Sequence, residues 1–239
     1  MSKYFVVTDV HGCYDDLIAT LTKHGYEKDN KDHIFISCGD LLDRGVQPLE
    51  TLRFVNSIPK DRKYLIYGNH EQLMEDVITR NYVTTRDYYN GTATTILCAL
   101  GKHDDRQIDN YVSMFAELPE WKEYISSTQD FVEFGDFICV HGWIPCEEVY
   151  DHYKPVEDWR NKSFNWCRWY NGMNAWLDGV KEPGKTIICG HVKSEYGLRY
   201  IHQQEEPADF SQPFVDDGII ALDSHVFKTH KLNCLVIDI

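Results

Sequence analysis

The sequence has no long apolar segment and no leader-like start. No apolar run approaches the ~20 residues that a membrane helix requires. The first residues, Met1 to Asp9, turn acidic too early for a signal peptide and predict a buried strand instead. We therefore expect a cytoplasmic protein with no membrane partner.

Basic residues are also scarce. The 24 Lys and Arg residues are outnumbered by 38 Asp and Glu residues, which gives a formal net charge of −14. Nucleic-acid binding depends on Lys and Arg side chains that neutralise phosphates, so we do not expect nucleic acid as the partner. The acidity favours solubility, and bound cations would cancel part of it locally. The oligomeric state stays open.

The eight cysteines form no C-x-x-C pair, and a disulfide framework is not expected in a chain of this size and type. Several of them lie inside apolar runs, where free cysteine behaves as a small hydrophobic residue. Internal repeats, low-complexity tracts and linkers are absent as well. A length of 239 residues then predicts a single domain over 1–239.

Strands and helices alternate in the first 80 residues. Apolar runs predict strands at 4–8, 33–38 and 64–67, and amphipathic segments predict helices at 14–24, 48–55 and 71–81. This alternation is typical of parallel strands joined by crossover helices.

The rest of the chain has a different pattern. Residues 82–125 are predicted to be mostly helical, with breaks at 90–92 and 103–105. A hairpin is expected across Gly135-Asp136, followed by strands at 186–189, 219–222 and 233–237. The stretches 145–160 and 193–217 have little periodicity and predict surface loops.

Five short polar blocks follow apolar runs, and four of these runs are strand-like. The blocks are Asp9-Val10-His11-Gly12, Gly39-Asp40-Leu41-Leu42-Asp43-Arg44-Gly45, Gly68-Asn69-His70-Glu71, His141-Gly142 and Gly190-His191. In open α/β sheets, ligands bind beyond the carboxyl ends of the strands, so these blocks are expected to converge on one sheet edge.

The side chains in these blocks suit divalent metals, which take carboxylate oxygen, amide oxygen and imidazole nitrogen. Asp9 and His11 lie two residues apart and would point the same way in an extended segment. Asp40 could bridge two ions, and Asn69, His141 and His191 would complete the second. Two metals ~3.5–4 Å apart can clamp a phosphate and activate a shared water. The inventory therefore predicts metal-assisted hydrolysis of a phosphate ester.

The motifs D-x-H-G, G-D-x-x-D-R-G, G-N-H-E, H-G and G-H, in this order, resemble the phosphoprotein phosphatase family of calcineurin-like metallophosphoesterases. The resemblance covers nearly the whole chain. It extends to the short lambda-phage-type Ser/Thr protein phosphatases and to the diadenosine tetraphosphatases. It implies an α/β fold, a β-sandwich of two mixed sheets flanked by helices.

The resemblance also implies individual roles. Asp9, His11 and Asp40 would bind the first metal, and the second would be bound by Asp40, Asn69, His141 and His191. A metal-bridging hydroxide would attack phosphorus, with His70 as the general acid and Asp43 holding it. Arg44 and Arg168 would bind phosphate oxygens, Arg168 because Trp166-Cys167-Arg168 resembles a W-x-R motif. Arg160 is the rival for that second role, and Glu71 is expected to be structural.

Four features depart from the family pattern, one of them the H-G-W segment from His141 to Trp143, which replaces the commoner H-A or H-G-G. Thr8 replaces the usual Gly before the first motif, Tyr67 replaces an Arg before G-N-H-E, and His225 replaces a Gly in an I-D-T-G pattern. The loss of a cation at Tyr67 puts the usual substrate clamp in question. His225 would either line the pocket or occupy a turn.

These observations favour a serine/threonine protein phosphatase that uses two divalent ions, with Mn²⁺ preferred and Fe, Zn, Ni or Mg possible. The enzymatic alternative is symmetrical hydrolysis of dinucleoside polyphosphates such as diadenosine tetraphosphate. A non-enzymatic, metal-dependent scaffold is the third alternative, although every proposed ligand and His70 are present.

Overall fold

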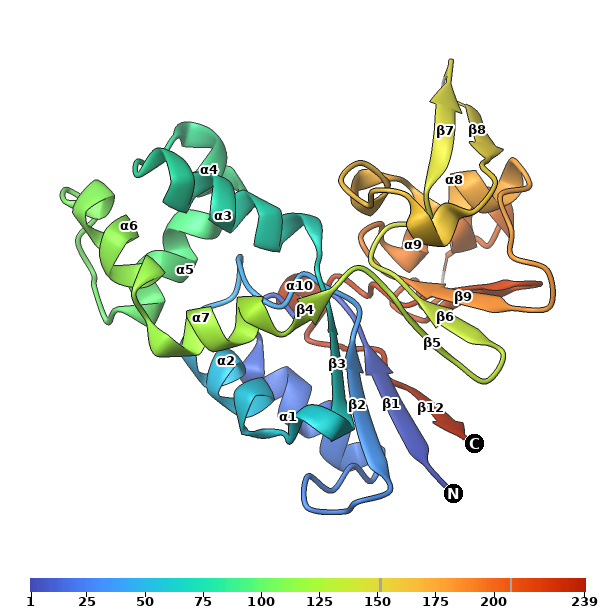
Figure 1. Ribbon diagram of the computed structural model, residues 1–239, viewed down its shortest axis with the longest axis horizontal. Coiled ribbons are helices and arrows are strands. Elements are labelled where there is room, and N and C mark those ends of the chain that lie inside the picture. The colour runs from blue at the N-terminus through green and yellow to red at the C-terminus, as the bar shows by residue number, and fades with distance from the viewer. Residues whose placement is uncertain (151, 207) are drawn as a thin grey trace.

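The computed structural model describes residues 1–150, 152–206 and 208–239, and its core consists of two five-stranded sheets (Figure 1). The first sheet has the strand order β12-β1-β2-β3-β4. Strands β1, β2, β3 and β4 run parallel to one another, and β12 runs antiparallel to β1. The bounds are β1 Lys3–Val7, β2 His33–Ser37, β3 Lys63–Ile66, β4 Thr128–Gln129 and β12 Leu235–Asp238.

The helices between these strands are those predicted from the apolar periodicity. They are α1 Tyr14–Lys23, α2 Pro48–Ser57 and α3 Asn69–Arg80, with a 3₁₀ turn at Lys60–Arg62. Pro48 occupies the first turn of α2, where its missing N–H leaves no helical bond unmade. Helix α3 begins two residues before the predicted start, so Asn69 and His70 lie in its first turn.

A helical region follows α3, as predicted for residues 82–125. Its helices are α4 Thr85–Asn90, α5 Thr92–Ala99, α6 Ile108–Ala116 and α7 Pro119–Ser126. The breaks at Gly91 and around residues 103–105 lie where the sequence predicts them. An apolar core joins this region and α1–α3 to the first sheet, and it includes Phe35, Leu65, Ile96 and Phe115.

The second sheet has the order β10-β11-β9-β6-β5, in which β11, β9 and β6 run parallel and the two outer strands antiparallel. The bounds are β5 Val132–Phe134, β6 Phe137–Cys139, β9 Thr186–Cys189, β10 Phe214–Asp216 and β11 Ile219–Ala221. The face of this sheet that points away from the first sheet is covered by a cluster rich in aromatic residues. Helix α8 Gly172–Leu177 and a 3₁₀ turn at Cys167–Trp169 contribute to this cluster.

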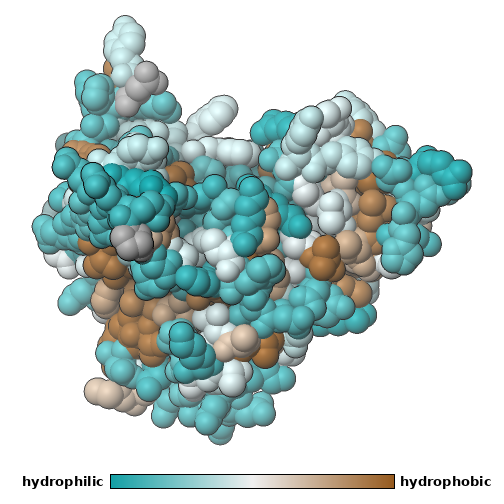
Figure 2. Space-filling model, turned by 180° about the vertical axis from the view of Figure 1, so that it is seen from behind, coloured by the Kyte–Doolittle hydropathy of each residue, from teal (hydrophilic) through white to brown (hydrophobic). Residues whose placement is uncertain are grey.

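The two sheets share an apolar interior. Val6, Ile36 and Ile66 of the first sheet pack in one cluster with Cys139 and Ile188 of the second. The predicted sandwich of two mixed sheets flanked by helices is thus confirmed. Figure 2 shows that hydrophilic residues predominate on the back face, between scattered hydrophobic patches.

The prediction of irregular surface loops at 145–160 and 193–217 is wrong for much of both stretches. The first contains a hairpin that projects from the body, β7 Cys146–Val149 and β8 His152–Pro155, and a 3₁₀ turn at Trp159–Asn161 (Figure 1). The second contains α9 Ser194–Tyr196, a π-helical turn at Gly197–Ile201 and β10. Residues 151 and 207, in the same two stretches, lie outside the described residues.

The hairpin escaped prediction because it lacks the alternation of a half-buried strand. Glu147 and Glu148 are both exposed, so no apolar face marks β7. The last helix, α10 Val226–Thr229, is likewise too short to leave a periodic pattern. None of the described helices is both long and apolar enough to cross a bilayer.

Candidate dinuclear metal site

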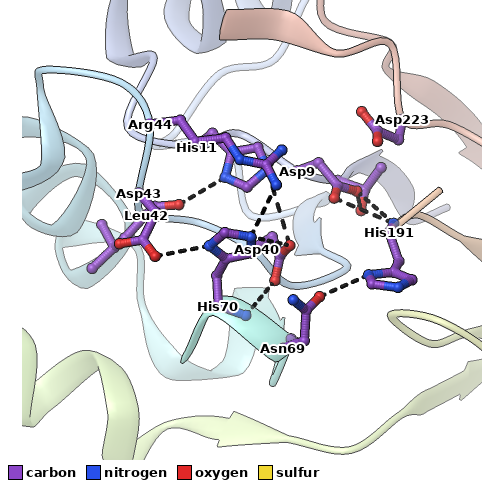
Figure 3. Close-up of polar contacts among 12 residues, drawn as sticks. Asp9, His11, Asp40, Leu42, Asp43, Arg44, Asn69, His70, His191 and Asp223 are labelled. Carbon is purple, nitrogen blue, oxygen red and sulfur yellow. Dashed lines mark hydrogen bonds and ion pairs between the residues drawn. The ribbon is translucent and has the colours of Figure 1, made fainter. Parts of the chain in front are cut away.

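The loops after β1 and β2 lie side by side at the carboxyl edge of the first sheet. The main-chain N of Asp9 donates to Gly39 O at 3.1 Å, and the N of His11 donates to Asp40 O at 3.0 Å. Asp9, His11 and Asp40 have φ angles of 50°, 52° and 53°. Such left-handed backbone is uncommon outside glycine and concentrates at functional sites. Figure 3 shows the three side chains around one centre.

Three buried or half-buried histidines each give one ring N–H to a main-chain carbonyl. The donors and acceptors are His11 Nδ1 to Leu42 O (2.8 Å), His141 Nδ1 to Cys38 O (2.8 Å) and His191 Nε2 to Trp169 O (3.1 Å). Because a carbonyl oxygen only accepts, each of these nitrogens carries the proton. The other nitrogen of each ring therefore presents a lone pair, as a metal ligand must.

Two of these lone pairs converge on Asn69. Its Oδ1 lies 2.7 Å from His141 Nε2 and 2.8 Å from His191 Nδ1, and Asp40 Oδ1 lies 3.3 Å from His141 Nε2. Every atom in this set is an acceptor, so the atoms repel one another unless a cation lies among them. These lone-pair atoms therefore fit a divalent metal bound by Asp40, Asn69, His141 and His191.

The first predicted metal position is formed around the other oxygen of Asp40. Asp40 Oδ2 lies 4.0 Å from His11 Nε2 and 3.8 Å from His70 Nε2. Asp9 stands beside this group, but its carboxylate accepts the main-chain N–H of His191 at 3.0 Å and the hydroxyl of Thr8 at 2.6 Å. The ligand atoms that lie close enough together for one ion are those of His11, Asp40 and His70, whereas Asp9 belongs to neither cluster. Asp9 as a ligand of the first metal therefore stays a prediction, and Asp40 is the residue that both clusters share.

Burial sets the protonation of the site. It lowers the pKa of His141 well below its usual value and that of His191 to about 4, which keeps both rings neutral. Burial also raises the pKa of Asp40 to about 7 and that of Asp9 well above its usual value, the latter with help from the neighbouring charge of Asp223. Buried carboxylates of this kind are stabilised by a bound cation.

His70 has different partners from the other three histidines. Its Nδ1 donates to Asp43 Oδ2 at 2.8 Å, and the same oxygen accepts the hydroxyl of Thr92 at 2.7 Å. The Asp43 N–H donates to Thr95 Oγ1 at 2.9 Å. Burial works against a charged His70, but the negative charges of Asp40 and Asp43 outweigh it and raise its pKa. The raised pKa favours a second proton on His70, and Nε2 can carry it only when the Arg44 Nη2 donor, 3.1 Å away, turns to another acceptor.

Arg44 lies over the same centre. Its Nη1 is 3.1 Å from His11 Nε2 and its Nη2 is 3.1 Å from His70 Nε2, while its guanidinium stacks on Phe227 at 5.1 Å. Gly91 packs against the Arg44 backbone so closely that a Cβ there would overlap Arg44 N, and its φ is +90°. The Asn90-Gly91 element thus lets the helical region approach the loop that carries Arg44.

Arg168 is 7% exposed, and its charge acts on His141 of the second ligand cluster. Its Nη2 pairs with Asp130 at 3.1 Å, its Nε donates to Phe164 O at 3.1 Å, and its guanidinium lies 4.3 Å from the Tyr67 ring centroid. These side chains line a cleft of about 600 Å³ that also contains Glu75. Arg160, the alternative candidate for the second phosphate-binding arginine, pairs with Glu133 and Glu182.

Glu71 organises the loops that carry the ligands. Its two oxygens accept the main-chain N–H groups of Asp40 (2.9 Å), Leu41 (3.0 Å) and Gly68 (2.8 Å), and the hydroxyl of Tyr124 (2.8 Å). It is 1% exposed and contributes no atom to either ligand cluster. The contacts agree with the structural role expected for it.

Sequence reasoning assigned no role to Thr92, Thr95 or Asp223. The two threonines left no signal, because their contacts with Asp43 join residues about fifty positions apart. Asp223 did leave one, since it follows a predicted strand as the other polar blocks do. His225, whose role was open, has a φ of 61° and precedes α10, and its ring packs on Phe227 at 4.4 Å.

Cys38 lies six positions before Arg44, the C-x5-R spacing of a cysteine-based phosphate loop. Its thiol is fully buried, and burial raises its pKa well above the usual value. A thiolate nucleophile needs the opposite environment, so the spacing does not make Cys38 reactive.

Comparison with known proteins gives a consistent result. The sequence model of the calcineurin-like phosphoesterases matches residues 2–227. The asymmetrical bis(5'-nucleosyl)-tetraphosphatase PrpE of Bacillus velezensis is 27% identical over 244 residues, which cover 88% of this chain and 94% of that protein. Serine/threonine-protein phosphatase 2 of Salmonella typhimurium is 27% identical over 207 residues, 83% of this chain and 84% of that protein.

Among solved structures, the cold-active protein-tyrosine phosphatase of a psychrophilic Shewanella species aligns with a TM-score of 0.58. The alignment covers 100% of this chain and 76% of that one at 18% sequence identity. At this identity the likeness concerns the fold, the same sandwich of two sheets.

Proposed function

This chain belongs to the calcineurin-like phosphoesterase family, and on that basis we propose that residues 1–239 form a single catalytic domain that dephosphorylates phosphoserine and phosphothreonine in proteins. The family predicted from the motifs is confirmed, and with it a metal-dependent phosphatase activity. The substrate and the individual roles below are proposals.

We assign the first metal to Asp9, His11 and Asp40 and the second to Asp40, Asn69, His141 and His191. Mn²⁺ is the proposed ion, because the mixed oxygen and nitrogen donors suit it and contain no thiolate. When bound, the two metals would neutralise phosphate charge and lower the pKa of a water molecule between them.

The chain's own residues then handle the proton and the phosphate. His70 donates the proton from Nε2 to the leaving oxygen, and Asp43 holds the ring and keeps it protonated. Arg44, whose Nη1 and Nη2 face the centre beside His11 and His70, binds phosphate oxygens. Arg168 binds the phosphate or the adjoining peptide from the cleft beside Tyr67.

The observation that carries the proposal is the position of the His70–Asp43 pair. His70 Nε2 lies 3.8 Å from Asp40 Oδ2, the carboxylate shared by both metal positions. A protonated imidazole at that place can reach the leaving oxygen of a phosphate bound to the same centre. A scaffold with no catalytic role would have no need of this arrangement.

Dinucleoside polyphosphates are the second candidate substrate. The relative named as an asymmetrical bis(5'-nucleosyl)-tetraphosphatase covers 88% of this chain, slightly more than the relative named as a serine/threonine phosphatase. The alternative that the sequence favours is symmetrical cleavage, which yields two ADP from diadenosine tetraphosphate. Asymmetrical cleavage yields ATP and AMP instead.

The decisive experiment compares phosphoserine peptides with diadenosine tetraphosphate, using metal-stripped enzyme and added Mn²⁺. A higher kcat/KM for the peptides supports the proposed substrate. A higher value for the dinucleotide favours the second candidate, and the nucleotide products then identify the cleavage mode. Turnover of neither substrate, with p-nitrophenyl phosphate also untouched, contradicts the proposed function.

A further inference from the structure

Asp223 and His191 follow two neighbouring parallel strands of the second sheet, so they lie at the same edge of that sheet. Strand β11 runs parallel to β9, with Ala221 opposite Cys189, and Leu222 N donates to Cys189 O at 2.9 Å. Asp223 lies two residues after Ala221, and His191 lies two residues after Cys189. The second sheet therefore brings a carboxylate next to a proposed metal ligand.

Asp223 is 4% exposed and Asp9 is 2% exposed, so both carboxylates are buried. Figure 3 shows Asp223 on the Asp9 side of the centre, and Asp9 accepts the main-chain N–H of His191, the residue that follows the neighbouring strand β9, at 3.0 Å. Oδ1 of Asp223 accepts the N–H of His225 at 2.7 Å. Over residues 1–150, 152–206 and 208–239, no hydrogen bond to its Oδ2 is formed.

The two carboxylates also lack a paired cation. In the described part of the chain, no Lys, Arg or His nitrogen makes an ion pair with Asp9 or Asp223. Arg44 and Lys193 are near enough for their charges to act on Asp223, but neither contacts it. Two buried carboxylates that repel each other are costly unless a positive charge lies close to both.

We propose that Asp223 is a positioning residue for the first metal, supplying negative charge that strengthens binding of the ion held by Asp9, His11 and Asp40. The inference rests on the proposed metal-dependent function. It adds a residue from the second sheet to a position otherwise made by the first.

A purely structural role for Asp223 predicts that Asp223→Asn binds Mn²⁺ as tightly as wild type does. If Asp223 only formed the turn before α10, its amide would serve as well, because Asn also offers an oxygen to the His225 N–H. The variant Asp223→Asn therefore keeps the turn and removes the charge. The metal-free variant should unfold at a higher temperature than metal-free wild type, because one of two neighbouring buried carboxylates is gone.

The test is calorimetric titration of metal-stripped, full-length protein with Mn²⁺. We expect Asp223→Asn to weaken one of the two Mn²⁺ sites at least tenfold and to reduce the rise in melting temperature that Mn²⁺ produces. Asp223→Glu, which keeps the charge, should restore most of the affinity. The matched control is Asp217→Asn, an exposed acid before the opposite end of β11, which should bind Mn²⁺ as wild type does.

Equal Mn²⁺ affinities in wild type and Asp223→Asn, or a metal-free melting temperature below that of wild type, overturn the inference and leave the proposed function standing. Failure of wild type to bind Mn²⁺ or any other divalent ion overturns the proposed function itself. If Asp223→Asn does not fold, Asp223→Ser provides the same test, because its hydroxyl can also accept the His225 N–H.

Discussion

Nδ1 of His70 donates a hydrogen bond of 2.8 Å to Oδ2 of Asp43, and both side chains are almost fully buried. The same Asp43 oxygen is held by Thr92, so the ring cannot rotate without breaking a fixed network. His70 thereby points its other nitrogen at the shared carboxylate of Asp40. This arrangement leads to the first two predictions.

His70→Asn should leave the metal content nearly intact and lower kcat on a phosphoserine peptide by two orders of magnitude or more, roughly the range of general acid catalysis. Elemental analysis and steady-state kinetics measure the two quantities. The loss on p-nitrophenyl phosphate should be smaller, because that leaving group hardly needs a proton. His103→Asn, at an exposed histidine, is the control. Full activity of His70→Asn on phosphoserine contradicts the acid role.

Asp43→Asn should move the alkaline limb of the kcat–pH profile to lower pH. A general acid acts only while protonated, so activity falls as pH rises through its pKa. The negative charge of Asp43 helps to raise the pKa of His70, so its removal lowers that pKa and the limb follows. A pH profile with the alkaline limb unmoved, or moved upward, is inconsistent with the pairing.

Asp40→Asn should lose metal and activity together. Oδ1 of Asp40 faces His141 and Oδ2 faces His11, so a residue with a single oxygen cannot serve both positions. Elemental analysis of the purified variant should find at least one metal missing. Both metals retained at wild-type occupancy would refute the bridging role.

Gly91→Ala should destabilise the protein and impair substrate binding, because a Cβ at Gly91 overlaps the Arg44 backbone. Gly179→Ala is a matched control: its φ of +85° is close to the +90° of Gly91, but nothing lies within 4 Å of a Cβ there. Overpacking should make the free energy of unfolding of Gly91→Ala lower by roughly 1–3 kcal/mol than that of Gly179→Ala. Denaturant unfolding measures the stability and steady-state kinetics measures KM. Equal free energies of unfolding and equal KM values for the two variants would contradict the prediction.

Arg168→Ala should lower kcat/KM on phosphopeptides about thirtyfold or more, because removing one partner of a buried charge pair typically costs roughly 2–5 kcal/mol and about 1.4 kcal/mol is a factor of ten. Arg160→Ala should change it little, because Arg160 is tied to Glu133 and Glu182 on the surface. Parallel kinetics of the two variants distinguish the rivals. An equal effect from both, or a larger one from Arg160→Ala, would reverse the assignment.

The parts of the site that could be predicted from sequence are those in which local pattern and position in the fold agree. Asp40 follows an apolar run, lies in a Gly-Asp turn and is part of a specific motif, and the structure places it at the centre of both clusters. The predicted helix at 14–24 agrees with α1 for a similar reason, since Leu17 and Leu21 face the core.

Contacts between distant segments could not be predicted. Thr92 and Thr95 are ordinary helix residues by sequence, and only the packing of α5 against the Asp43 loop gives them a role. Tyr67 looked like the loss of a cation, yet its ring supports the guanidinium of Arg168. The short strands β7 and β10 were missed because each includes exposed residues and forms no buried apolar run, unlike the equally short β9 and β11.

The ring orientations of His11, His141 and His191 are set by carbonyl oxygens of Leu42, Cys38 and Trp169, which belong to the main chain. A substitution at any of those three positions changes a side chain and leaves the carbonyl in place. Substitutions at these three positions can therefore change the packing around the centre while the three imidazoles keep their orientation. That robustness offers a physical reason why one metal centre can persist while specificity diverges around it.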